Sequence, residues 1–104
     1  MDETAPERLS KTAALAKVRQ LASDSASIVV LPHGRKRQRT RAISLRQIQL
    51  CCQRGTMTEG PFLNQHGAWQ LNLYRHAAGE EITCVVAIDW PSRLLIVTVI
   101  RGRH

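Results

Sequence analysis

The strongest constraint on the fold is the alternation of apolar and polar residues in the last third of the chain. Within residues 69–76 every second residue is apolar up to Leu73, which is the period of a strand with one buried face. The segments 81–89 and 94–101 are apolar on both faces, as expected for strands inside a sheet. Because only short turns separate these segments, they are predicted to form three consecutive antiparallel strands.

Two further strands are indicated upstream. Residues 28–31 form a β-branched, apolar run that Pro32 stops, which predicts a short buried strand. Residues 57–63 are compatible with a strand at the edge of the sheet, since Pro61 cannot donate a backbone hydrogen bond and disfavours a central position.

The N-terminal region predicts a helix. Thr4 and Glu7 have the spacing of a capping box, so we expect a helix to begin there, and apolar residues then recur at helical spacing from Leu15 to Ala22. Serine-rich residues 23–27 end it. This helix could serve as a partner-binding arm, but its single apolar stripe favours docking on the rest of the domain.

A second helix is predicted over residues 45–54, packed across one face of the sheet. Ser44 and Gln47 form a capping box at its start, and Gly55 is expected to end it in a left-handed conformation. The residues expected on its buried face are Leu45, Ile48 and either Cys51 or Cys52, with the other cysteine pointing sideways.

The charge of the chain is uneven. Fifteen Lys and Arg against eight Asp and Glu give a formal net charge of +7. Residues 33–54 contain seven Lys or Arg and no acidic residue, so the excess belongs to one segment. Such a field attracts polyanions, and RNA or another nucleic acid is the obvious class of partner. An acidic partner protein is the alternative that composition leaves open.

Within that segment, residues 33–41 predict a short and very polar helix. His33, Arg37 and Arg41 stand four residues apart, so they line one face of this helix. Like charges at this spacing cost a few tenths of a kcal/mol per pair, roughly, which carboxylates, a partner or an anionic ligand should offset. These three residues are the candidate catalytic set.

Each of the three residues also has a structural interpretation. Arg37 could pair with Glu80 or Glu81, and His33 could bond a backbone carbonyl. The set as a whole favours function, because eight carboxylates cannot neutralise all the neighbouring cations. The additional candidates for nucleic-acid binding are Arg35, Lys36, Arg39, Arg46 and Arg54.

Other chemistries find little support. The three cysteines match neither a disulfide framework nor a zinc motif, and the four histidines lack metal-binding spacing, so we expect no metal and no cofactor. No apolar run is long enough to span a bilayer, and the opening residues 1–3 do not resemble a signal peptide. We therefore expect a single-domain, cytoplasmic protein without a membrane partner.

The spacing His33-x3-Arg37-x3-Arg41-x-Ile43-Ser44, followed by a helix and by strands that close at residue 101, resembles an uncharacterised bacterial domain family. The family signature is His-x3-Arg-x3-Arg-Gly-Ile-Ser, and Ala42 stands here in place of its glycine. The resemblance covers residues 28–101. The order of elements is also similar to small toxins of the RelE and BrnT type, which combine helices with an antiparallel sheet and cleave messenger RNA.

The resemblance implies an α+β fold with N-terminal helices on an antiparallel, toxin-like meander. It implies a helical extension over residues 1–26 and one toxin-like domain over residues 27–104. The implied function is an RNA-binding or messenger-RNA-cleaving component of a toxin–antitoxin system, with an acidic antitoxin-like protein as a partner.

The resemblance also implies roles for the candidate residues. In a metal-independent ribonuclease, His33 would act as general acid or base, and Arg37 and Arg41 would stabilise a phosphorane-like transition state. A second set of candidates follows from the toxins, which carry basic and aromatic residues on the sheet and C-terminal tail: Tyr74, Arg75, Arg101 and His104. The alternative is a non-catalytic, basic interaction module.

Overall fold

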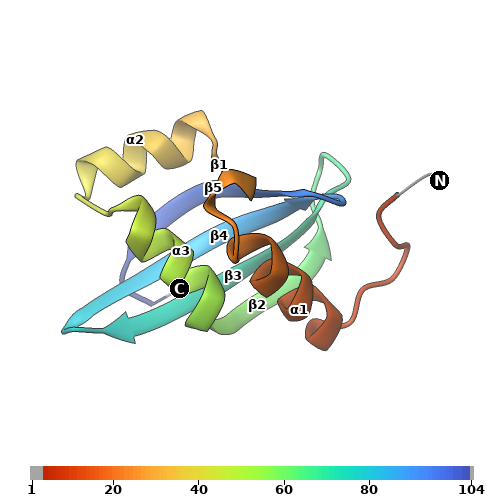
Figure 1. Cartoon of the computed structure of the whole chain (residues 1–104), viewed down its shortest axis with the longest axis horizontal. Helices are drawn as coiled ribbons and strands as arrows, with labels where there is room; N and C mark the ends of the chain where they lie inside the picture. Colours follow the sequence, from red (N-terminus) through yellow and green to blue (C-terminus); the bar gives the residue numbers. More distant parts are fainter. Residues whose placement is uncertain (1–3, 104) are drawn as a thin grey trace.

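The computed structural model describes residues 4–103, and it confirms the predicted α+β class with helices packed on a sheet (Figure 1). The helices are α1 (Lys11–Ala22), α2 (Pro32–Thr40) and α3 (Leu45–Arg54), with a short 3-10 turn η1 (Ser25–Ser27). The strands are β1 (Ile28–Val30), β2 (Thr56–Leu63), β3 (Trp69–Ala77), β4 (Glu80–Asp89) and β5 (Arg93–Arg101). His104 and residues 1–3, on which the signal-peptide argument rested, lie outside the described residues.

The five strands form one sheet in the order β1-β5-β4-β3-β2. Strands β2 to β5 follow each other as an antiparallel meander, so the three consecutive strands predicted from the alternation are confirmed. β2 is an edge strand, as Pro61 indicated, and its pairing with β3 is irregular on either side of Glu59. β1 joins the other edge in parallel with β5, with Ile28 aligned to Leu94. The sheet is therefore mixed rather than wholly antiparallel.

The hydrophobic core lies between the sheet and the two helices α1 and α3, which cover the same face (Figure 1). α2 lies apart from this layer, beside the part of β5 that extends past β1 (Figure 1). The largest fully buried apolar side chains are Val18, Ile48, Leu71, Leu73, Val86, Leu94, Ile96 and Val99.

The start of α1 differs from the prediction. Residues 4–10 are irregular, and the helix begins at Lys11, where the Ser10 side chain accepts a hydrogen bond from the backbone of Ala13 at 3.0 Å. Thr4 and Glu7 have the capping spacing, but no apolar stripe follows them at once, so the turn has nothing to pack on. The irregular segment is held by the Trp69 indole, which donates to the Pro6 carbonyl.

The start of α3 confirms the predicted capping box. The Ser44 hydroxyl accepts from the Gln47 backbone at 3.0 Å, and the Gln47 side chain accepts from the Ser44 backbone at 2.8 Å. Leu45 was predicted to be buried and is 42% exposed, because the first residue of the helix turns to solvent. Cys51 and Cys52 are both fully buried, so neither points sideways.

Gly55 ends α3 in an extended conformation, with φ −72°, and not in the predicted left-handed one. A side chain at this position would collide with the backbone of Cys51 and Tyr74. The glycine is therefore explained by close packing against β3 and not by backbone twist.

α1 and α3 satisfy each other's free C-terminal carbonyls. The Arg19 guanidinium donates to the carbonyl of Cys52 at 3.1 Å and to that of the residue after α3 at 2.9 Å. The amides of Gln49 and Gln53 both donate to the carbonyl of Ala22 at the end of α1. Because helix ends otherwise leave such groups unsatisfied, these bonds fix α1 on the domain. Among residues 4–103 no helix is long and apolar enough to cross a membrane.

Candidate functional site

The candidate site is built on the edge of the sheet where β1 stops. β1 pairs only with residues 94–96 of β5, and Pro32 then ends the strand and opens α2. The rest of β5 continues beyond its neighbour, and α2 lies along this free edge (Figure 1). The backbone of Leu31 donates to the carbonyl of Ile96 at 3.0 Å and anchors the start of the helix.

Gly34 brings α2 close to β5. A Cβ atom at this position would lie 2.7 Å from the carbonyl oxygen of Ile96 and 3.2 Å from that of Val97. Carbon atoms do not approach backbone oxygens this closely, so only glycine permits the observed spacing. The helix is thereby seated on the backbone of the strand.

A groove of about 350 Å³ runs between α2 and β5. The lining residues are His33, Arg37 and Arg41 on the helix side and Thr98, Val99, Ile100 and Arg101 on the strand side. The structure thus places the three residues that the sequence singled out along one wall of one groove. Arg41 is the residue that caps α2, one position after its last turn, and its side chain still lines the groove.

The three side chains have no partner among the residues that the structure describes. Among residues 4–103 neither the His33 ring nor the guanidinium groups of Arg37 and Arg41 make a side-chain hydrogen bond or an ion pair. His33 is exposed, whereas Arg37 and Arg41 are half-buried. Half-buried cations with free donors are suited to hold an anion.

The structural alternative for Arg37 is not formed. Glu80 pairs instead with Arg101, at 3.4 Å, and Glu81 accepts a hydrogen bond from Tyr74 at 2.5 Å. Glu80 therefore pairs with a cation of the groove, Arg101, and neither carboxylate reaches Arg37.

Arg101 joins the two walls of the groove. Its Nε donates to the carbonyl of Arg41 at 2.9 Å and one Nη donates to that of Ala42 at 3.4 Å, while the other Nη faces Glu80. It thereby ties the C-terminal end of α2 to β5. Arg101 belongs to the second set of candidates, and in the structure it holds the two walls of the groove together. Thr98 was missed, because its place beside α2 depends on the parallel pairing of β1.

The other predicted nucleic-acid contacts do not line the groove. Arg35, Lys36 and Arg39 are exposed on the outer side of α2. Arg46 and Arg54 are exposed on α3, and Arg46 donates to Gln49 at 3.2 Å. The basic residues are thus spread over two helices.

Two residues of the second set of candidates, Tyr74 and Arg75, lie on opposite faces of β3. Tyr74 alternates with the buried Leu73 and so faces away from the helices, where the Arg103 guanidinium lies 5.2 Å from the centre of its ring. The hydrogen bond to Glu81 raises the pKa of the Tyr74 hydroxyl. Arg75 lies on the other face, beside α3. Neither residue lines the groove.

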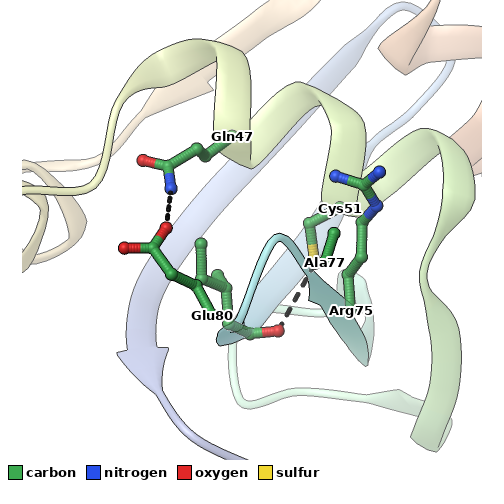
Figure 2. Close-up of a pocket in the computed structure, with 6 residues that line it drawn as sticks. Gln47, Cys51, Arg75, Ala77 and Glu80 are labelled. Atoms are coloured by element: carbon green, nitrogen blue, oxygen red, sulfur yellow. Dashed lines mark hydrogen bonds between the residues drawn. The ribbon is translucent and has the colours of Figure 1, made fainter.

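Arg75 belongs instead to a cavity of about 30 Å³ under α3, with Cys51 and Glu80 (Figure 2). Figure 2 shows the Gln47 amide donating to Glu80, at 2.7 Å. The thiol of Cys51 donates to the carbonyl of Leu73 at 3.3 Å. This space is sufficient for a water molecule and too small for a substrate.

The three cysteines are buried and free. Hydrogen bonding with Cys51 and Cys52, together with burial, raises the pKa of the Cys84 thiol well above its usual value. These thiols fill the core between α3 and the sheet. Within the described residues, no three His, Cys, Asp or Glu side chains come together in a way that could hold a metal ion.

Comparison with known proteins identifies one family. The model of a domain of unknown function, DUF4258, matches residues 30–101. The chain belongs to the DUF4258 family. The matched segment begins just before α2 and ends with β5, so it includes both walls of the groove and omits α1. The expectation of an uncharacterised domain family is confirmed at this level. No curated protein and no solved structure matches the chain.

Proposed function

We propose that this DUF4258 protein is an RNA-binding domain whose α2–β5 groove holds the phosphodiester backbone. The observation that carries the proposal is the row formed by His33, Arg37 and Arg41, which lines the groove without a partner among residues 4–103. The net charge of +7 supports it, because such a field attracts polyanions before any specific contact is made.

The chemistry of the row fits a phosphate ester. Guanidinium groups present several donors in one plane and bind phosphate oxygens in pairs. Arg37 and Arg41 are half-buried, so water competes less for a bound phosphate than it would at an exposed surface. A phosphate also relieves the repulsion between like charges four residues apart on a helix.

We further propose that the bound RNA is cleaved, as in the toxins of the RelE and BrnT type that the order of elements resembles. The His33 ring would accept the proton of a ribose 2′-hydroxyl as its oxygen attacks the adjacent phosphorus. The bond from phosphorus to the 5′-oxygen breaks, leaving a 2′,3′-cyclic phosphate, and the departing oxygen takes a proton from water. Arg37 and Arg41 would stabilise the extra negative charge of the transition state.

Binding is tested by reversing two charges of the groove. In the double variant Arg37→Glu, Arg41→Glu, affinity for RNA is expected to fall by roughly 10- to 100-fold, because two charge-assisted contacts are replaced by repulsion. Fluorescence anisotropy with a labelled RNA at about 50 mM salt measures it. The matched control is Arg8→Glu, Lys11→Glu, which changes the net charge equally at exposed residues outside the groove. Equal losses in both variants, or no RNA binding by the native protein, would contradict the proposal.

The catalytic role of His33 has a separate test. His33→Ala is expected to leave the melting temperature nearly unchanged, because the ring has no partner among the described residues, and to slow RNA cleavage by about 10²- to 10⁴-fold. The measurements are thermal melts beside messenger-RNA integrity and growth during inducible expression in bacteria. A variant that melts earlier and regains activity on cooling would mean that His33 has only a structural role.

A second candidate function is a non-catalytic module that binds an acidic partner protein, such as an antitoxin-like protein. The exposed outer cations of α2, Arg35, Lys36 and Arg39, favour it, because they have no partner among the described side chains. A native chain that neither binds nor cleaves RNA, yet captures an acidic protein through these residues, would support this alternative.

A further inference from the structure

We infer that the groove takes one polynucleotide strand, and not a duplex, with successive phosphates against His33, Arg37 and Arg41. This inference rests on the proposed RNA binding and specifies the class of ligand. It follows from the spacing of the row, from its recessed position and from the composition of the lining.

The spacing of the row is suited to consecutive phosphates of one strand. Residues four apart on a helix are separated by about 6 Å along the axis, so the three side chains form a ladder with that interval. The roughly 3.4 Å by which a duplex strand advances per nucleotide is a rise along the axis, and the strand also winds around that axis, so consecutive phosphates lie farther apart than this in space. One strand can therefore place one phosphate at each step, and selection against a duplex rests on the recessed position of Arg37 and Arg41.

Two residues of the row are recessed between two walls. Arg37 and Arg41 are half-buried, and β5 forms the opposite side of the groove from Thr98 to Arg101. We infer that a single strand follows this groove of about 350 Å³ with its phosphates against the half-buried pair. A duplex presents its phosphates on a convex surface, and it would meet the exposed outer residues Arg35 and Arg39 before it reached the recessed pair.

The lining indicates how the strand is held. None of the lining residues is Phe, Tyr or Trp, so no side chain in the groove offers the broad ring on which unpaired bases usually stack. Binding through phosphates alone predicts weak dependence on base sequence. It also predicts that single-stranded DNA binds about as well as RNA, since both carry the same phosphodiester.

The test compares two pairs of arginines on the same helix. Arg37→Ala, Arg41→Ala removes the recessed pair, and Arg35→Ala, Arg39→Ala removes an exposed pair with the same spacing and charge. The ligands are a labelled 12-nucleotide RNA, the same RNA in a duplex and the DNA strand of the same sequence. Thermal melts first establish that both variants are folded.

Removing the recessed pair is expected to weaken single-strand binding by at least roughly 10-fold and duplex binding by less than about 2-fold. The slope of log affinity against log salt for the single strand should flatten by about 1.4, which corresponds to two phosphates. Removing the exposed pair should leave that slope unchanged. The DNA strand should bind within about 3-fold of the RNA strand.

Several results would overturn the inference. A duplex that binds the native protein as tightly as the single strand, and depends equally on the recessed pair, would show that the groove does not select one strand. DNA binding more than about 10-fold weaker than RNA binding would overturn contact through phosphates alone. If no nucleic acid binds, the proposed function itself fails, so the two failures are distinguishable.

Discussion

Val18→Asp is expected to unfold the protein at room temperature. Val18 is a fully buried residue of α1, in the core that this helix shares with α3 and the sheet. A carboxylate at this position would lose its hydration without gaining a partner, and such changes cost more than about 4 kcal/mol of the free energy of unfolding. A small domain has only about 5–15 kcal/mol in total. Circular dichroism and urea denaturation measure the loss.

Ala16→Asp is the matched control, because Ala16 lies on the exposed side of the same helix. It should change the free energy of unfolding by no more than about 0.5 kcal/mol. A Val18→Asp protein that stays folded would mean that α1 is detachable. The predicted boundary between an extension over residues 1–26 and a domain over residues 27–104 would then describe two separable parts.

Gly34→Ala is expected to lower the free energy of unfolding. Gly34→Val is expected to lower it further. Helix propensity alone predicts the opposite sign, since Ala is favoured over Gly by about 1 kcal/mol inside a helix. The new Cβ would lie 2.7 Å from the Ile96 carbonyl, so α2 must move away from β5. Overpacking of this kind lowers the free energy of unfolding by about 1–3 kcal/mol. Gly34→Val adds two further methyl groups, so its loss should lie at the upper end of this range.

The movement of α2 should also open the groove. We therefore expect Gly34→Val to weaken binding of single-stranded RNA at least as much as removing Arg37 and Arg41, although no charge is lost. Urea denaturation and anisotropy measure the two effects. Arg35→Ala is the control for stability, because its side chain is exposed on the same helix. If Gly34→Ala raised stability, the close approach of helix and strand would not be what holds the groove together.

Local signals predicted the elements whose boundaries are set by nearby residues. The capping box of Ser44 and Gln47 fixed the first turn of α3 because both hydrogen bonds close within four residues. The same spacing at Thr4 and Glu7 does not mark a helix start, since a capping box does not form without a helix that packs on the rest of the domain. The alternation in β3 located that strand for a similar reason, because its buried apolar residues recur at every second position from Trp69 to Leu73.

The sequence predicted one wall of the candidate site and not the other. The ladder of His33, Arg37 and Arg41 follows from helical spacing, which sequence displays directly. The opposite wall, from Thr98 to Arg101, depends on β5 lying between β1 and β4, and nothing in a local pattern tells a strand which neighbours it will have. The role of Arg101 as a tie between the walls was hidden for the same reason.

The position of β5 in the sheet has a consequence for the order of events during synthesis. β5 leaves the ribosome after the other four described strands, yet it lies inside the sheet, between β1 and β4. Until it emerges, β1 has no neighbour to pair with and α2 has no surface on which to rest. A nascent chain would therefore expose the arginine ladder as a loose basic segment, and the groove would come into existence only when translation of the domain is complete.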